Sequence, residues 1–167
     1  MFPMRLRQIY RSRFLFARLF SCGGENMMRY NNEKEIAEVV RTFEDATVSR
    51  EAWRHAHHLV VALYYLSVYD IEEATTRMRS GLFKLLGAFG VDLTKEMPYH
   101  ETLTVFWMRT VAEFNMSKNG ASLLDKANEL VANYDKDYPL RFYSREYLFS
   151  DEARAKYVKG DLSNNEY

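Results

Sequence analysis

A chain of 167 residues, 47% of them hydrophobic and 15% aromatic, is long enough to enclose one hydrophobic core and is too apolar for an intrinsically disordered protein. Seven glycines and three prolines are too few for the many turns of an all-β domain of this size. The 23 basic and 23 acidic residues balance, so no overall electrostatic field recruits nucleic acid, and we expect no nucleic-acid partner.

Two further features bear on location. The longest apolar run, residues 59–66, is far shorter than a bilayer-spanning helix, so we expect no transmembrane segment. The single cysteine, Cys22, excludes an intrachain disulfide and permits a reducing compartment. The sequence therefore favours a cytoplasmic location.

The first 26 residues differ from the rest in charge. Five arginines against one glutamate give this segment a net charge of +4, and the remainder carries −4. It can be an Arg-rich targeting peptide, a basic helix that binds a membrane surface or a partner, or an upstream extension before a natural start at Met27 or Met28. Helical patterning begins only after it, so we favour the last interpretation. We predict a loosely ordered basic extension over residues 1–28 and a single helical domain over 29–167.

From residue 32 onward, apolar residues recur with the period of a helix. The first predicted helix, about 33–45, has one apolar stripe. The second, about 50–69 with Ser49 as its N-cap, is apolar nearly all round and is therefore expected to be the central helix. Asp70 and Glu73 form a capping box that opens a third helix, which ends at Gly90.

The second half of the chain continues this pattern. Pro98 suits the first turn of a fourth helix with a core stripe from Leu103 to Phe114, and a fifth helix covers about 121–134. The aromatic tail after Pro139 is expected to pack back as one or two short helices, the last capped by Ser150 and closed by Gly160. The predicted fold is all-α: an up-and-down bundle of four to five helices with short C-terminal helices packed back.

All four histidines lie in two short segments, Trp53-Arg54-His55-Ala56-His57-His58-Leu59 and Tyr99-His100-Glu101-Thr102. On a helix, His55 and His58 share the face that continues into the core, whereas His57 points elsewhere and is expected to be at most partly covered. In an up-and-down bundle the second and fourth helices run parallel, so both segments come to the same end. We therefore predict a cluster of His55, His58, His100 and Glu101.

Such a cluster has a definite chemistry. Neutral imidazoles with a carboxylate suit a divalent transition metal (Zn, Fe, Mn or Ni) and leave positions for water. Glu101 would act as a metal ligand or a catalytic general base, and Glu51, one turn before His55, would orient a ligand. Two helix N-termini facing the pocket would also favour a small anionic ligand. The sequence predicts a metal-binding or catalytic pocket on these grounds.

The alternative is equally concrete. A buried histidine near a helix start is often a hydrogen-bonded core residue, and in that case the protein is a non-catalytic binding or interaction module with structural histidines. The sequence does not decide between an enzyme and such a module.

Three segments carry a resemblance: Trp53-x-His55-x-x-His58-Leu59, Tyr99-His100-Glu101-Thr102, and the run from Phe142-Tyr143-Ser144-Arg145 through Leu148-Phe149-Ser150-x-x-Ala153-Arg154. Over residues 36–162 the chain resembles a family of small bacterial proteins with no assigned activity. The resemblance implies an all-helical fold and marks His55, His58, His100 and Glu101 as motif positions, but it implies no reaction. The chain departs from the family at Phe83-Lys84-Leu85, where members tend to have Arg-Tyr-Asn. A looser likeness to helical metal-dependent phosphohydrolases lacks a further aspartate ligand.

Overall fold

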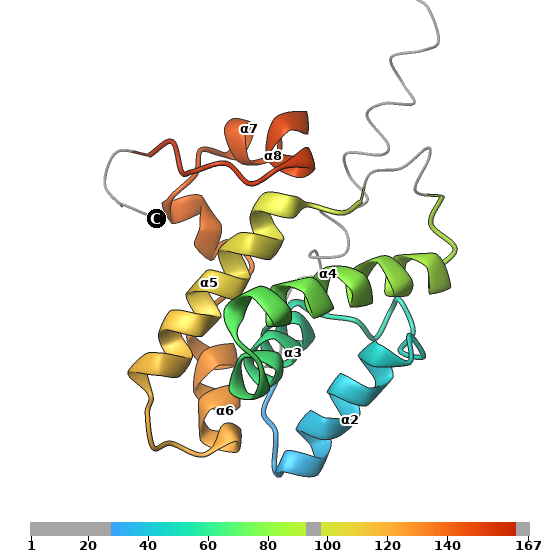
Figure 1. Cartoon of the computed structure of the whole chain (residues 1–167), viewed down its shortest axis with the longest axis vertical. Coiled ribbons are helices and arrows are strands. Elements are labelled where there is room, and N and C mark those ends of the chain that lie inside the picture. The colour runs from blue at the N-terminus through green and yellow to red at the C-terminus, as the bar shows by residue number, and fades with distance from the viewer. Residues whose placement is uncertain (1–27, 93–97, 163–167) are drawn as a thin grey trace, which may run out of the picture.

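The computed structural model describes residues 28–92 and 98–162, and Figure 1 shows how their helices are arranged. The helices are α2 (Glu33–Glu44), α3 (His55–Val68), α4 (Ile71–Ala88), α5 (Glu101–Ser117), α6 (Leu123–Asn133), the 3-10 helix η1 (Tyr138–Arg141), α7 (Arg145–Leu148) and α8 (Asp151–Ala155). No strand occurs in these two described ranges, and the all-α prediction is confirmed. The predicted basic extension lies outside the described residues except for Met28, which packs against the core.

Short polar side chains decide where most helices begin. Asn32, Asp70, Ser122 and Ser150 each accept a hydrogen bond from the backbone N–H three residues further on, at 2.9–3.2 Å. A side chain that accepts from this N–H replaces the missing intrahelical partner in the first turn. The structure therefore confirms Asp70 and Ser150 as helix caps, and α2, α4 and α6 start within about two residues of the predicted positions.

The start of α3 was predicted wrongly. Ser49 closes a turn, because its hydroxyl and carbonyl oxygens both accept from the N–H of Ala52, at 3.2 and 3.1 Å. Arg54 then remains extended (φ −125°, ψ 165°), and the helix begins at His55 rather than near residue 50. His55 therefore occupies the first turn of α3.

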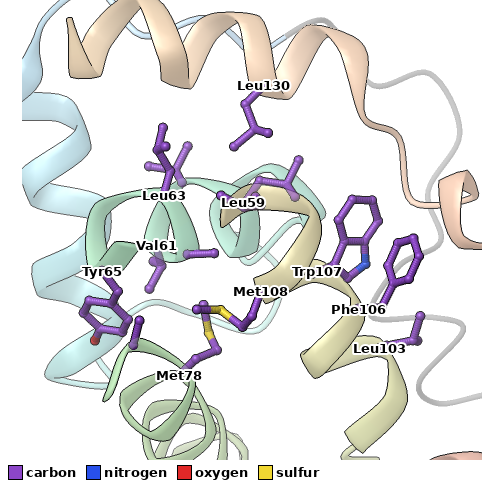
Figure 2. Packing of buried hydrophobic residues seen from close by; sticks show 14 of the residues in the cluster. Leu59, Val61, Leu63, Tyr65, Met78, Leu103, Phe106, Trp107, Met108 and Leu130 are labelled. Carbon is purple, nitrogen blue, oxygen red and sulfur yellow. The ribbon is translucent and has the colours of Figure 1, made fainter. Parts of the chain in front are cut away.

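The central position of α3 is confirmed. It contacts α2, α4, α5 and α6, and Leu59, Val60, Val61 and Leu63 are at most 1% exposed. Figure 2 shows Leu130 of α6 pointing toward α3 from one side, while Met78 and Met108 point toward each other from α4 and α5. A helix that is apolar all round needs neighbours on every side, and the other helices provide them.

Two contacts show that α3 and α5 run parallel, as predicted. Near their ends, the Asn115 side chain donates to the carbonyl of Leu66 at 3.2 Å. Near the start of α3, the His55 ring packs on Trp107 with 4.7 Å between ring centroids. The helices are offset, however, because Trp107 comes seven residues after His100. At 1.5 Å per residue, His100 therefore lies about 10 Å before the level of His55, on the N-terminal side along the α5 axis.

The C-terminal segment packs against the first turns of α5. Figure 1 shows α7 and α8 together beside the end where α5 begins. After the 3-10 helix around Pro139, this segment contains two short α-helices, as predicted. The last ends at Ala155 because Lys156 is extended (φ −144°, ψ 160°). Gly160 therefore closes no helix. A Cβ atom there would lie 2.4 Å from the carbonyl oxygen of Phe142, so Gly160 allows a close backbone approach.

Candidate functional site

His100 is the N-cap of α5 and is 1% exposed. Its Nδ1 accepts the N–H of Leu103 at 3.2 Å, which leaves the ring proton on Nε2, and Nε2 donates to the carbonyl of Leu148 at 2.8 Å. Burial lowers the pKa of His100 to about 4, although the bond to Leu148 raises it. The imidazole is therefore neutral at physiological pH and joins α5 to α7 with both nitrogens.

Thr102, from the same motif, also binds the C-terminal segment. Its fully buried hydroxyl donates to the carbonyl of Lys156 at 2.9 Å and accepts from the N–H of Val158 at 3.1 Å. The carbonyl of Val158 accepts in turn from the Tyr143 hydroxyl at 2.8 Å. These bonds supply partners for backbone groups that would otherwise be buried unpaired.

Glu101 is held by two side chains. The Tyr99 hydroxyl donates to Oε2 at 2.6 Å, and the Arg79 guanidinium contacts both carboxylate oxygens, with Nε at 3.1 and 3.2 Å. Burial raises the pKa of the Glu101 carboxyl, but the bonds from Arg79 and Tyr99 outweigh burial and bring the pKa below its usual value. A general base that works near neutral pH needs a raised pKa, so this environment does not favour the predicted catalytic role.

His55 faces a different neighbour. It is 3% exposed, its Nε2 lies 3.3 Å from the carbonyl of Tyr134 just after α6, and its ring packs on Trp107. Burial lowers its pKa to about 4. His55 therefore links the start of α3 to α5 and α6.

His57 and His58 enclose the indole of Trp53. The Trp53 ring is stacked between Phe43, with 5.3 Å between centroids, and His57, with 5.4 Å. His58 meets the indole edge-on, and its Nε2 accepts the indole N–H at 2.6 Å, so the ring proton is on Nδ1. Burial lowers the pKa of His57 to about 4 and that of His58 to about 3. His57 is partly covered, as predicted, and its Nδ1 accepts the N–H of Arg54 at 2.9 Å.

The predicted convergence of His55, His58, His100 and Glu101 is not found. Over residues 28–92 and 98–162, no group of three or more His, Cys, Asp or Glu side chains is arranged to hold a metal ion. His55 and His58 diverge within α3, because His55 lies against Tyr134 and Trp107 while His58 accepts from Trp53. The offset between α3 and α5 brings His100 to α7 instead of to these histidines. The prediction correctly placed the helices parallel but did not include their relative shift.

Glu51 and the predicted anion site also differ from expectation. Glu51 is exposed in the turn before α3, where its backbone carbonyl, and not its carboxylate, accepts from the Arg54 guanidinium. At both helix starts a histidine already accepts a backbone N–H, that of Arg54 or that of Leu103. At α5 this bond uses one of the first-turn N–H groups that an anion at a helix N-terminus binds, and at α3 it uses the N–H of the N-cap residue.

A cavity between α3, α4 and α5 is a feature that sequence reasoning missed. It has a volume of about 60 Å³, several times the roughly 10–15 Å³ that one water molecule needs. Apolar side chains form most of its wall, including both tryptophans, Trp53 and Trp107, and both Met78 and Met108. Several lining residues, among them His58, Tyr99 and Thr104, are only partly buried, so the cavity opens to solvent on one side. Periodicity places these residues on inward faces but does not show where the faces fail to meet.

Comparison of the chain with family models, curated proteins and solved structures gave no match. None of the described helices is both long and apolar enough to cross a membrane.

Proposed function

We propose that this protein is a non-catalytic binding module that takes a small, mainly apolar ligand in the cavity between α3, α4 and α5. The observation that carries the proposal is the cavity itself, which three helices line almost entirely with apolar and aromatic side chains and which opens to solvent. Preformed apolar concavities with a few polar groups are the usual small-molecule sites of proteins.

The state of the histidines supports binding rather than metal chemistry. The His58 nitrogen Nε2 holds Trp53, and both His100 nitrogens hold backbone groups. These histidines therefore stabilise the packing of the helices, which agrees with the alternative of a binding module with structural histidines.

A titration with toluene tests the proposal. Because both tryptophans line the cavity, toluene binding is expected to change the intrinsic fluorescence and to raise the melting temperature of the full-length protein. The variant Ala62→Leu, which fills the wall on α3, is expected to weaken binding at least tenfold. Ala132→Leu makes the same change on the exposed face of α6 and is expected to bind as the wild type does.

A second variant that fills the cavity keeps the test conclusive if Ala62→Leu does not fold. Leu82→Phe enlarges a half-buried side chain in the cavity wall and is expected to fold and to block toluene. Equal toluene affinity in the wild type and in folded Ala62→Leu and Leu82→Phe would refute the cavity as the site. Stoichiometric metal in the purified protein, lost in His55→Ala or His100→Ala, would favour the metal-dependent alternative.

A further inference from the structure

The polar groups of the cavity are few and are gathered at identifiable places. Among the lining residues, His58 is neutral and holds Trp53, while Tyr99 and Thr104 come from the start of α5 and the residues just before it. Beside Tyr99 lies the ion pair of Glu101 and Arg79. The cavity therefore has an apolar body and a polar end formed by Tyr99 and Thr104.

The polar end has no net charge. Burial raises the pKa of Tyr99 to about 12, so its phenol is neutral, and the charges of Glu101 and Arg79 offset each other in direct contact. A charged ligand entering an apolar cavity loses its hydration without gaining an opposite charge. These groups therefore select a neutral ligand.

The polar end also favours a hydrogen-bond donor. The Tyr99 hydroxyl uses its proton for Glu101 at 2.6 Å and also hydrogen-bonds with the Thr104 side chain. The Thr104 hydroxyl donates to the carbonyl of His100 at 3.1 Å. Because both hydroxyl protons have acceptors within the protein and Tyr99 is engaged by Glu101 and Thr104, what remains for a ligand is a lone pair on the Thr104 oxygen, which accepts a hydrogen bond. A ligand with an O–H or N–H group matches this arrangement, whereas a ligand with only an acceptor does not.

Size and shape suggest a single ring. The volume of about 60 Å³ is smaller than the roughly 150 Å³ apolar cavity that takes benzene, so the ligand is at most one ring, part of which lies in the open mouth. The indoles of Trp53 and Trp107 provide aromatic surface, and the thioethers of Met78 and Met108 make favourable contacts with rings.

We propose that the ligand is a small neutral single-ring aromatic molecule with one O–H or N–H donor, of the phenol class, and that Thr104 accepts its hydrogen bond. This inference rests on the proposed function of the cavity. It adds the chemical class of the ligand and names Thr104 as the residue that sets the preference for a donor.

Calorimetric titration of the full-length protein with phenol, anisole, toluene and benzoate tests the inference. Anisole keeps the ring and oxygen of phenol but has no donor, and benzoate is charged. One net hydrogen bond corresponds to about 1 kcal/mol, so phenol is expected to bind roughly fivefold more tightly than anisole or toluene. Benzoate is expected to bind more weakly than all three.

The matched variants are Thr104→Val and Thr76→Val. Both threonines donate to the carbonyl four residues earlier, but Thr76 is exposed on α4 and does not line the cavity. Thr104→Val is expected to remove the preference for phenol over toluene, and Thr76→Val is expected to retain it. Equal binding of phenol and toluene by the wild type, or a preference that survives in Thr104→Val, would overturn the inference and leave the cavity site intact. Failure of toluene itself to bind would count against the proposed function.

Discussion

The two histidine-bearing helix starts of this protein lie on parallel helices and yet differ in what surrounds their imidazoles. At the start of α5, His100 is fully enclosed and bonds to backbone groups of α5 and α7. At the start of α3, His58 is partly exposed, bonds to the Trp53 side chain and borders the cavity. The α5 start meets the backbone carbonyl of Leu148. At the α3 start His55 meets the carbonyl of Tyr134, whereas His58 meets the aromatic and apolar side chains that line the cavity. The group that packs against the histidine, rather than the histidine itself, therefore decides whether the helix start connects two elements or borders the cavity.

Acidification is expected to have the largest effect, because both regions depend on neutral imidazoles. Below pH 6.5 the histidines of the unfolded chain take up protons, while those of the folded chain stay neutral down to about pH 4. Stability is therefore full above about pH 6.5 and is lost as the pH falls toward 4, on the order of 2 kcal/mol for each well-buried histidine. Urea unfolding at pH 7.5, 6.0 and 5.0 measures this loss, and equal midpoints at all three pH values would contradict it.

Removing the imidazole is expected to cost more stability at the start of α5 than at the start of α3. His100→Ala loses the N-cap and leaves the carbonyl of Leu148 buried without its donor, so we expect a loss of about 3 kcal/mol. His100→Asn can still cap α5 but does not reach Leu148, and about half of that loss is expected. His58→Ala, at the partly exposed cavity edge, is expected to cost about 1 kcal/mol. Urea unfolding at pH 7.5 gives all three values, and equal losses for His58→Ala and His100→Ala would remove the distinction.

Two threonines on α5 sharpen the comparison within one helix. Thr102→Val keeps the shape but leaves the Lys156 carbonyl and the Val158 N–H without a partner, so we expect a loss of about 2 kcal/mol. Thr104→Val removes only a bond to a carbonyl of its own helix and is expected to change stability by less than about 0.5 kcal/mol. Thermal melts of both variants test this difference. Equal losses of stability in Thr104→Val and Thr102→Val would contradict this difference between the face of α5 at the cavity and the face at α7 and α8.

The amino-acid sequence by itself determined the helices and their order. Asp70 and Ser150 mark helix starts through local hydrogen bonds that span three residues, and the apolar run of residues 59–66 requires a central helix. These features depend on neighbours in the chain, so periodicity and capping chemistry are enough to predict them. The prediction that Ser49 caps α3 was wrong because a serine side chain can cap a turn as readily as a helix.

Only the tertiary structure decided which groups the histidines contact and whether a cavity forms. The parallel direction of α3 and α5 follows from short connections, but their offset of about 10 Å depends on how Trp107 packs against His55. That offset separates His100 from His55 and His58 and places Tyr99 and Thr104 beside the cavity. A shift between two helices is set by the packing of many side chains from distant parts of the chain, and no local pattern in the sequence records it.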